Sequence, residues 1–201
     1  MSWILTHTGK HFDLMCPSAE NVSPLDIAHA LAHLCRFNGH THRFYSVAQH
    51  SCMVAELVPA EHRLVALLHD ATEAYIGDIT RPFKALLPDA RQIEQHIWHA
   101  ICARFRLDPE LPACIHDADM IALATEKRDL MPSDGTPWPC LSGTQPLAQR
   151  MRAWSSEEAF HQYQMQLFNE LTAHNRRLAL QTQPRRQPAS PAYLSEGRDC
   201  A

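Results

Sequence analysis

The residues best suited to chemistry lie at the end of one strongly apolar stretch. His69 and Asp70 are adjacent, and Glu73 follows four positions after His69 and three after Asp70. On a helix these three side chains can therefore converge. Asp78 follows Gly77 in a turn that can bend back toward the same helix end. Because buried charges are costly unless they are paired or metal-bound, this apolar helix with four titratable groups indicates a polar site.

Two further residues complete a plausible site. His50 lies on an otherwise packable helix, and Asp119 precedes the apolar run 120–124 on another core-type helix. Two imidazoles and two carboxylates make a mixed nitrogen and oxygen site that suits Mn, Co, Fe, Ni or Zn rather than Ca. A divalent metal of this kind lowers the pKa of bound water and stabilises charge on a phosphoryl oxygen.

A second His-Asp dipeptide, His116-Asp117, is a rival for this role. Counted from its aspartate, Asp117, this dipeptide lacks the acids that lie three and eight positions after Asp70. Asp117 and Asp119 would point about 200° apart on a helix, so one metal would not be reached by both. The sequence favours Asp119.

The composition narrows the class of protein. The chain has 201 residues with a net charge of -4, and 14 of them are histidines, the commonest metal ligands. Residues 175–201 carry five Arg against two acids, which leaves the rest of the chain acidic and argues against nucleic-acid binding. Seven cysteines without a CxxC motif indicate reduced thiols, and no segment has the length of a membrane anchor. We therefore expect a cytoplasmic protein with neither a nucleic-acid nor a membrane partner.

The pattern of apolar residues and caps predicts an all-α domain over residues 1–174, with about six or more helices in one globular unit. A short extended stretch is expected near residues 11–14, and a disordered tail rich in Arg, Pro and Gln over 175–201. The expected helices cover residues 25–35, 47–58, 60–74, 89–105, 112–130 and 156–174, with a long loop over 131–146.

The order His50, then His69-Asp70, then Asp119 resembles the H…HD…D signature of the HD-domain phosphohydrolases. The similarity runs from about Thr8 to Leu130 and is strongest to bacterial 5'-deoxynucleotidases and phage-type dATP triphosphohydrolases. It includes Thr8-Gly9 and the runs 26–31, 35–37 and 45–50.

This resemblance implies a helical HD-domain fold in which His50, His69, Asp70 and Asp119 bind the metal. It also implies that Glu73 and Asp78 orient or deprotonate the attacking water. Arg36 and Lys84 resemble phosphate contacts. The ring of Phe37 suits either core packing or stacking on a nucleoside. The remaining implications are a homo-oligomer, a dimer or larger, and a second divalent ion such as Mg or Co during turnover.

The function expected on these grounds is hydrolysis of (deoxy)nucleotides by metal-activated water. Two reactions stay open, removal of phosphate from a monophosphate and removal of tripolyphosphate from a triphosphate. A non-catalytic HD module that binds a nucleotide and signals is the alternative. Hydrolysis of a cyclic or alarmone nucleotide is a more remote one.

Overall fold

Two serine caps start the helices that build the core. The computed structural model describes residues 1–181. Helix α1 (Pro24–His33) begins after Ser23, whose hydroxyl accepts a hydrogen bond from the backbone N–H of Asp26. Helix α2 (Val47–Leu57) begins after Ser46, whose hydroxyl accepts from the N–H of Gln49. Both starts agree with the sequence prediction, because a serine oxygen satisfies an N–H that the first helical turn leaves unpaired.

The all-α prediction is confirmed for the described residues. The only strands there are β1 (Trp3–Leu5) and β2 (His11–Asp13), which form one antiparallel hairpin with Ile4 opposite Phe12. Short 3-10 turns cover 19–21, 36–39, 60–62 and 139–141. The other helices are α3 (Arg63–Leu68), α4 (Glu73–Ile76), α5 (Arg81–Lys84), α6 (Ala90–Phe105), α7 (Ala113–Leu130) and α8 (Ser156–Gln181).

One predicted helix is wrong at the position of the His-Asp pair. The sequence predicts a continuous helix over 60–74, but the chain forms α3 and α4 with tight turns over 69–72 between them. There the N–H of Ala71 bonds the carbonyl of Leu68, and the N–H of Glu73 bonds the carbonyl of Asp70. These bonds span three residues rather than four, so the turn is tighter than in an α-helix. The His-Asp pair therefore lies in a break between helices.

Three smaller differences concern the ends of the chain and one loop. The predicted extended stretch is β2, whereas its partner strand β1 was not expected. Helix α5 forms in a segment predicted only as a break. Helix α8 continues to Gln181, seven residues beyond the predicted end. Residues 182–201 of the predicted tail lie outside the described part of the chain.

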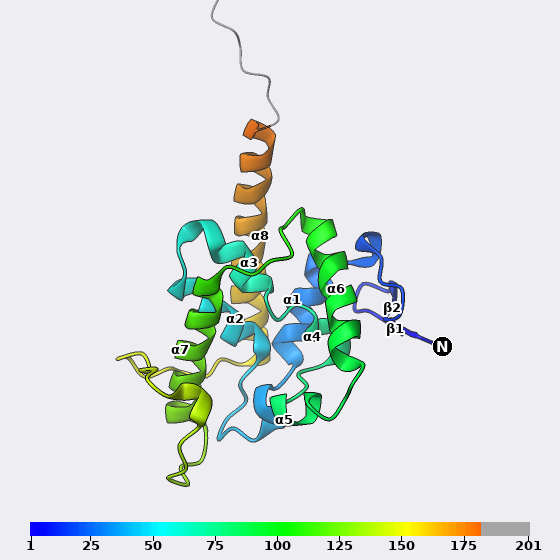
Figure 1. Ribbon diagram of the computed structural model, residues 1–201. Helices are drawn as coiled ribbons and strands as arrows, with labels where there is room; N and C mark the ends of the chain where they lie inside the picture. Colours follow the sequence, from blue (N-terminus) through cyan, green and yellow to red (C-terminus); the bar gives the residue numbers. More distant parts are fainter. Residues whose placement is uncertain (182–201) are drawn as a thin grey trace, which may run out of the picture.

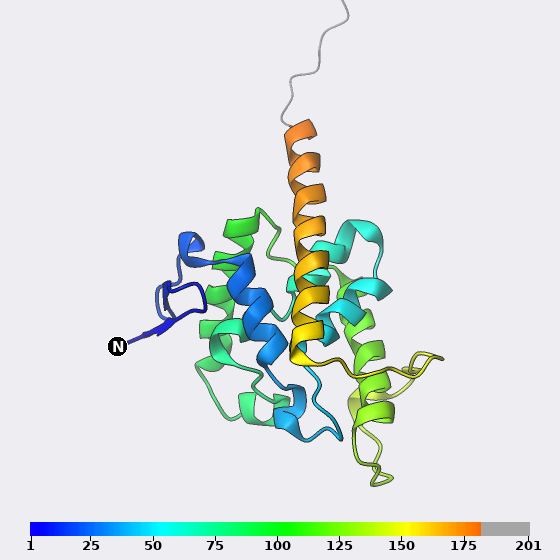
Figure 2. The same cartoon turned by 180° about the vertical axis from the view of Figure 1, so that it is seen from behind.

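The core lies where α8 packs across α1, α2 and α3 (Figures 1 and 2). Tyr163 and Leu167 of α8 are fully buried, and the Tyr163 hydroxyl donates to the carbonyl of Leu67 on α3. Helix α2 contacts α1, α3, α7 and α8, so it is enclosed on several sides. The packing of α2 and α3 against α7 and α8 positions the chemistry-bearing residues.

Two observations concern the wider properties of residues 1–181. Their six cysteines are free thiols, in agreement with the reduced state that the sequence predicts. No helix in this range combines the length and apolar character needed to cross a membrane.

Candidate metal centre and its cavity

Four of the predicted site residues come together from three separate elements. His50 lies in the first turn of α2, His69 and Asp70 lie in the tight turns after α3, and Asp119 lies in the second turn of α7. A ring nitrogen of each histidine and a carboxylate oxygen of Asp119 lie within 4.8 Å of one another, close enough to hold one metal ion. The structure thus gathers the residues that the sequence singled out.

The contacts centre on the Nε2 atom of His50. It lies 3.2 Å from Asp119 Oδ1 and 3.4 Å from Asp70 Oδ2. The Nε2 atom of His69 lies 3.3 Å from the same oxygen of Asp70. Asp70 therefore stands between the two imidazoles, although Arg36 also contacts its Oδ2 at 3.3 Å.

Each imidazole is oriented through its other nitrogen. His50 Nδ1 lies 2.6 Å from a carboxylate oxygen of Glu126, and His69 Nδ1 lies 2.7 Å from the carbonyl oxygen of Ala66. Both partners accept only, so in each ring Nδ1 carries the hydrogen and donates it. Both Nε2 atoms are buried and neither makes a hydrogen bond of acceptable geometry with any described residue. Two Nε2 atoms fixed in this way are typical of metal-binding histidines.

Glu126 is a member of the site that the sequence reasoning missed. Its carboxylate is fully buried and accepts from His50 and from the hydroxyl of Tyr45, the latter at 2.8 Å. It also contacts Arg36 at 3.3 Å. Burial alone would raise the pKa of Glu126, but Arg36 and His50 outweigh it and lower that pKa to about 2. Glu126 is therefore an ionised acceptor that holds His50 in place.

Arg36 is the buried cation of this site. Its guanidinium is almost enclosed and contacts both Asp70 and Glu126, while its Nε has no hydrogen-bond partner in the described chain. Burial works against its charge, but Glu126 and Asp70 raise the pKa of Arg36 well above its usual value. The predicted phosphate contact is thus also an internal counter-charge for the acidic residues.

The pKa shifts of the candidate metal ligands indicate a surplus of negative charge around them. Burial and Arg36 lower the pKa of His50, but Glu126 and Asp119 outweigh them and raise it to about 10. Burial would raise the pKa of Asp119, yet its contacts with His50 and with His69 lower it. Several carboxylates therefore share few cations here, and such a site favours an additional positive ion.

The two predicted catalytic acids, Glu73 and Asp78, border the same space. Burial raises the pKa of Glu73, with Asp70 and Asp78 adding to the effect, and its Oε2 atom is buried without a hydrogen-bond partner in the described residues. Burial also raises the pKa of Asp78, whose Oδ2 accepts from the backbone N–H of Phe37 at 3.1 Å. Carboxyl groups with raised pKa values beside a cavity are suited to proton transfer near neutral pH.

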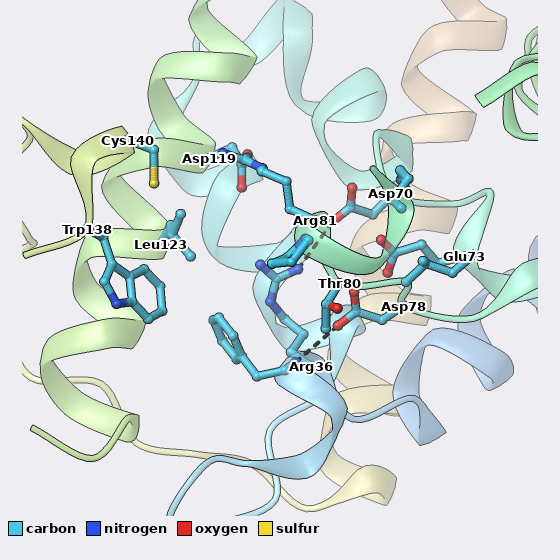
Figure 3. A pocket seen from close by; sticks show the side chains of 14 residues that line it. Arg36, Asp70, Glu73, Asp78, Thr80, Arg81, Asp119, Leu123, Trp138 and Cys140 are labelled. Carbon is cyan, nitrogen blue, oxygen red and sulfur yellow. Dashed lines mark hydrogen bonds and ion pairs between the residues drawn. The ribbon is translucent and has the colours of Figure 1, made fainter. Parts of the chain in front are cut away.

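A cavity of about 470 Å³ opens beside these residues. In Figure 3 the guanidinium of Arg36 lies between the acids Asp70, Glu73 and Asp78 and the side chain of Trp138. This volume falls within the range of small-molecule sites. The wall is lined by Arg36, Phe37, Asp70, Glu73, Asp78, Ile79, Thr80, Arg81, Pro82, Lys84, Asp119, Leu123, Trp138 and Cys140.

The predicted substrate contacts Phe37 and Lys84 both line this cavity. Phe37 adopts a left-handed backbone conformation (φ 55°), which is unusual for a bulky residue and marks local strain. Its ring lies 6.3 Å from that of Trp138, centroid to centroid, so the aromatic ring faces the cavity rather than the core. The Nζ of Lys84 contacts both carboxylate oxygens of Glu94, at 2.8 and 2.9 Å.

Of the residues around the site that the sequence reasoning missed, one had a sequence signal. Glu126 lies seven positions after Asp119, which is the spacing of two helical turns and places both on one face of α7. That spacing could have identified it. Tyr45 precedes a helix, and Trp138 lies in the loop 131–146, where no periodicity predicts contacts.

The rival dipeptide is excluded from the centre. His116 and Asp117 are both exposed on α7, whereas Asp119 is largely enclosed beside His50. The choice of Asp119 over Asp117 is consistent with this geometry.

Fold and site together define a helical protein with a candidate metal centre beside a polar and aromatic cavity. Comparison with models of known protein families gives no match. The chain is 46% identical over 143 residues to the uncharacterized protein YfdR of Escherichia coli, covering 71% of this chain and 80% of that protein. It is 37% identical over 127 residues to an uncharacterized protein of Rhodobacter capsulatus, covering 58% of this chain and 65% of that one. The chain belongs to the same family as YfdR.

Proposed function

We propose that this protein is a metal-dependent phosphohydrolase of the HD superfamily that acts on (deoxy)nucleotides. The observation that carries the proposal is the pair of buried Nε2 atoms of His50 and His69, each without a hydrogen bond. That of His50 lies beside the carboxylates of Asp70 and Asp119, and that of His69 lies beside Asp70. Two imidazoles and two carboxylates suit a divalent transition metal such as Mn, Co, Zn, Fe or Ni. A second ion such as Mg or Co remains part of the proposal.

The contacts of these residues fit a metal site better than they fit a purely structural cluster of ion pairs. A cluster of ion pairs would leave no ring nitrogen without a hydrogen bond, because an unsatisfied buried polar atom costs about 1–3 kcal/mol. Here the free-energy cost of burying the two Nε2 atoms would be offset by metal coordination. A bound divalent ion would supply Lewis-acid stabilisation and lower the pKa of a coordinated water.

The acids of the cavity supply the proton chemistry in this proposal. Glu73, with its free buried oxygen, accepts a proton from the attacking water, and Asp78 orients that water while anchored by the N–H of Phe37. The water attacks phosphorus in line with the leaving ester oxygen, the P–O bond to that oxygen breaks, and the leaving oxygen takes up a proton from solvent water.

The cavity wall supports a nucleotide as the substrate. Arg36, Arg81 and Lys84 place cationic groups on its wall that suit phosphate, although Arg36 and Lys84 are also paired with acids. Phe37 and Trp138 give aromatic surface that suits a base or sugar. A monophosphate and a triphosphate both remain candidates, since the cavity volume accommodates either class of small molecule.

The test is a product assay on a panel of deoxynucleoside mono- and triphosphates with Mn, Co and Mg. Release of inorganic phosphate from monophosphates identifies a nucleotidase, and release of tripolyphosphate identifies a triphosphohydrolase. Nucleotide binding without phosphate release under all three metals would refute hydrolysis and favour the non-catalytic signalling module.

A further inference from the structure

The cavity beside the metal centre has two unlike sides. In Figure 3 Asp70 and Glu73 lie on one side of Arg36, and Leu123 and Trp138 lie on the other. We call this second side the aromatic wall, and it consists of Phe37, Leu123, Trp138 and Cys140. A ligand that fills the cavity therefore meets charged groups at one end and a mostly apolar surface at the other.

The two aromatic rings of this wall are not part of the apolar core that residues 1–181 form. Trp98 and Trp154 are half-buried and pack against that core, whereas Trp138 is half-buried without packing there. Phe37 also lies outside the core, and its ring is 6.3 Å from that of Trp138, centroid to centroid. Aromatic side chains usually stabilise a fold through burial, so two that line a cavity instead present their surface to a ligand.

The chain that returns from the loop 131–146 is anchored to the last turns of α7. The N–H of Leu147 donates to the hydroxyl of Thr125 at 2.9 Å, and the N–H of Met151 donates to the carboxylate of Asp129 at 3.0 Å. Most side chains of the loop are exposed, so these hydrogen bonds, rather than core packing, hold it against α7. Trp138 is thus presented by a loop whose return is fixed.

Lys127 of α7 braces the outgoing half of the same loop. Its Nζ lies 4.9 Å from the centre of the Trp138 ring and donates to the carbonyl of Thr136 at 2.8 Å. Such a contact between a cation and an aromatic ring is attractive. Trp138 lines the cavity and Lys127 does not, so the brace does not occupy the space of a ligand. A side chain held in place before binding loses less conformational freedom when the ligand arrives.

We infer that the aromatic wall is the nucleoside-binding half of the cavity and that the base stacks on Trp138. The inference rests on the proposed function, because that proposal brings a nucleotide into this cavity with its phosphate beside the metal centre.

The chemistry of the wall also determines what it selects. Stacking on an aromatic side chain accepts every base, since each base has a π-face. None of the four side chains of the wall carries an amide, a carboxylate or a guanidinium group that could read the edge of a base. The wall therefore distinguishes nucleotides from other phosphate esters, and it does not strongly distinguish one base from another.

Binding of phosphate-free nucleosides tests the role of Trp138. Equilibrium dialysis of the full chain with Mn measures the affinities for the four deoxynucleosides and for inorganic phosphate. The four deoxynucleosides are expected to bind within about tenfold of one another. Trp138→Ala should bind them about 10- to 100-fold more weakly and should bind phosphate as before. Trp138→Phe keeps an aromatic face and should recover most of the affinity.

A matched control and the contrary results complete this test. Trp3→Ala removes a half-buried tryptophan of the N-terminal hairpin that does not line the cavity, and it should bind deoxynucleosides as the unmodified protein does. Circular dichroism shows whether each variant is folded. The inference is overturned if the unmodified protein binds no deoxynucleoside, if folded Trp138→Ala binds them normally, or if Trp138→Phe recovers nothing. A preference above tenfold for one base overturns the tolerance of the wall.

Cys140 provides a second measurement on the same wall. It is an exposed free thiol that lines the cavity, whereas Cys16 is an exposed free thiol outside it. A base stacked on Trp138 should slow the alkylation of Cys140 by iodoacetamide and leave that of Cys16 unchanged, as measured by mass spectrometry of the two peptides. This protection should be lost in Trp138→Ala. Equal alkylation of Cys140 with and without saturating deoxynucleoside overturns the inference.

These measurements separate the inference from the proposed function. Deoxynucleoside binding that depends on Trp138, without phosphate release from any nucleotide, refutes hydrolysis and leaves the nucleoside subsite in place. Phosphate release that is the same in Trp138→Ala and in the unmodified protein at subsaturating nucleotide refutes the subsite and leaves hydrolysis in place.

Discussion

His50 is held by a hydrogen bond at one ring nitrogen and is surrounded by carboxylates at the other. Glu126 of α7 fixes Nδ1, and the carboxylates of Asp70 and Asp119 surround Nε2. Because Glu126 is fully buried and also accepts from Tyr45, the ring has little freedom to rotate. The ligand geometry therefore depends on a residue that would not itself touch a metal.

The change Glu126→Gln tests this dependence. The amide is a weaker acceptor for His50 Nδ1 and removes a charge from beside Arg36, so metal affinity should fall about 10- to 100-fold. Titration of Mn or Co into metal-free protein measures it. The exposed control Glu61→Gln should bind as the unmodified protein does. Equal affinities for Glu126→Gln and the control would show that Glu126 does not position the ligand.

Substitutions at Glu73 and at Asp70 should distinguish a residue that acts in the chemical step from one that binds the metal. Glu73→Gln keeps the size of the side chain but removes the proton acceptor, so phosphate release should fall about 100- to 10,000-fold while the metal stays bound. Asp70→Ala should lose both metal and activity. Metal content and phosphate release are measured on the same samples. A Glu73→Gln protein with full activity contradicts the assigned role.

At this scale the sequence selected the candidate ligands that the structure brings together, but not the residues that support them. The order and type of His50, His69-Asp70 and Asp119 were sufficient to select the four residues, including Asp119 over Asp117. The acceptors for Nδ1 were not predicted. One is the backbone carbonyl of Ala66, which carries no sequence signal. The other, Glu126, is marked only by its seven-residue spacing from Asp119 on α7, which the sequence reasoning did not use.

The ends of the helices bring these residues together. Ser46 caps α2, and the first turn of that helix carries His50. Cap signals such as Ser46 and Ser23-Pro24 are local, so the sequence located these helix starts well. The break over 69–72 was missed because apolar residues continue through it at helical spacing, and only the three-residue hydrogen bonds reveal the tighter turn.

The change Ser46→Ala tests the cap. It leaves the N–H of Gln49 without its acceptor and should lower the free energy of unfolding by about 1 kcal/mol. Urea denaturation measures the change. The control Ser133→Ala, in the exposed loop 131–146, should leave stability within about 0.5 kcal/mol. A Ser46→Ala protein as stable as the control would show that the cap contributes nothing.

The N-terminal hairpin docks on α1 through stacked imidazoles. The rings of His7 and His29 lie 3.7 Å apart, and those of His29 and His33 lie 4.2 Å apart, centroid to centroid. Thr8 of the hairpin donates its N–H and hydroxyl to Asp26 on α1. Burial lowers the pKa of His29, and the neighbouring His33 and His7 lower it further, against Asp26.

This lowered pKa gives a predicted pH dependence. The folded state favours neutral His29, whereas the unfolded chain takes up the proton near the usual pKa of 6.5. The contribution of His29 to stability is therefore complete above pH 6.5 and is lost as the pH falls toward the folded pKa. His29→Phe keeps a stacked ring without a titrating group, so it should lose less stability between pH 7 and pH 5 than the unmodified protein. Urea denaturation at both pH values measures this, with the exposed His116→Gln as control. Identical losses in all three proteins would contradict the account.

On the scale of the whole molecule, some helices carry the candidate site and another helix covers them. Helices α2, α3 and α7 gather the candidate ligands, while α8 covers α1–α3 with its buried face. The all-α class followed from the helical spacing of apolar residues together with the cap residues at the helix starts. The extension of α8 to Gln181 did not, because its last turns leave the body of the protein and carry no buried stripe.

The central claim is that side chains from three elements hold one divalent cation per chain. Elemental analysis after loading with Mn or Co and removal of free ion measures it directly, on the unmodified protein, on His50→Ala and on His116→Ala. We predict one ion per chain in the unmodified protein and in His116→Ala, whose histidine is exposed outside the site, and loss of the ion in His50→Ala. A His50→Ala protein that keeps its full metal content, or an unmodified protein that binds none, contradicts the account.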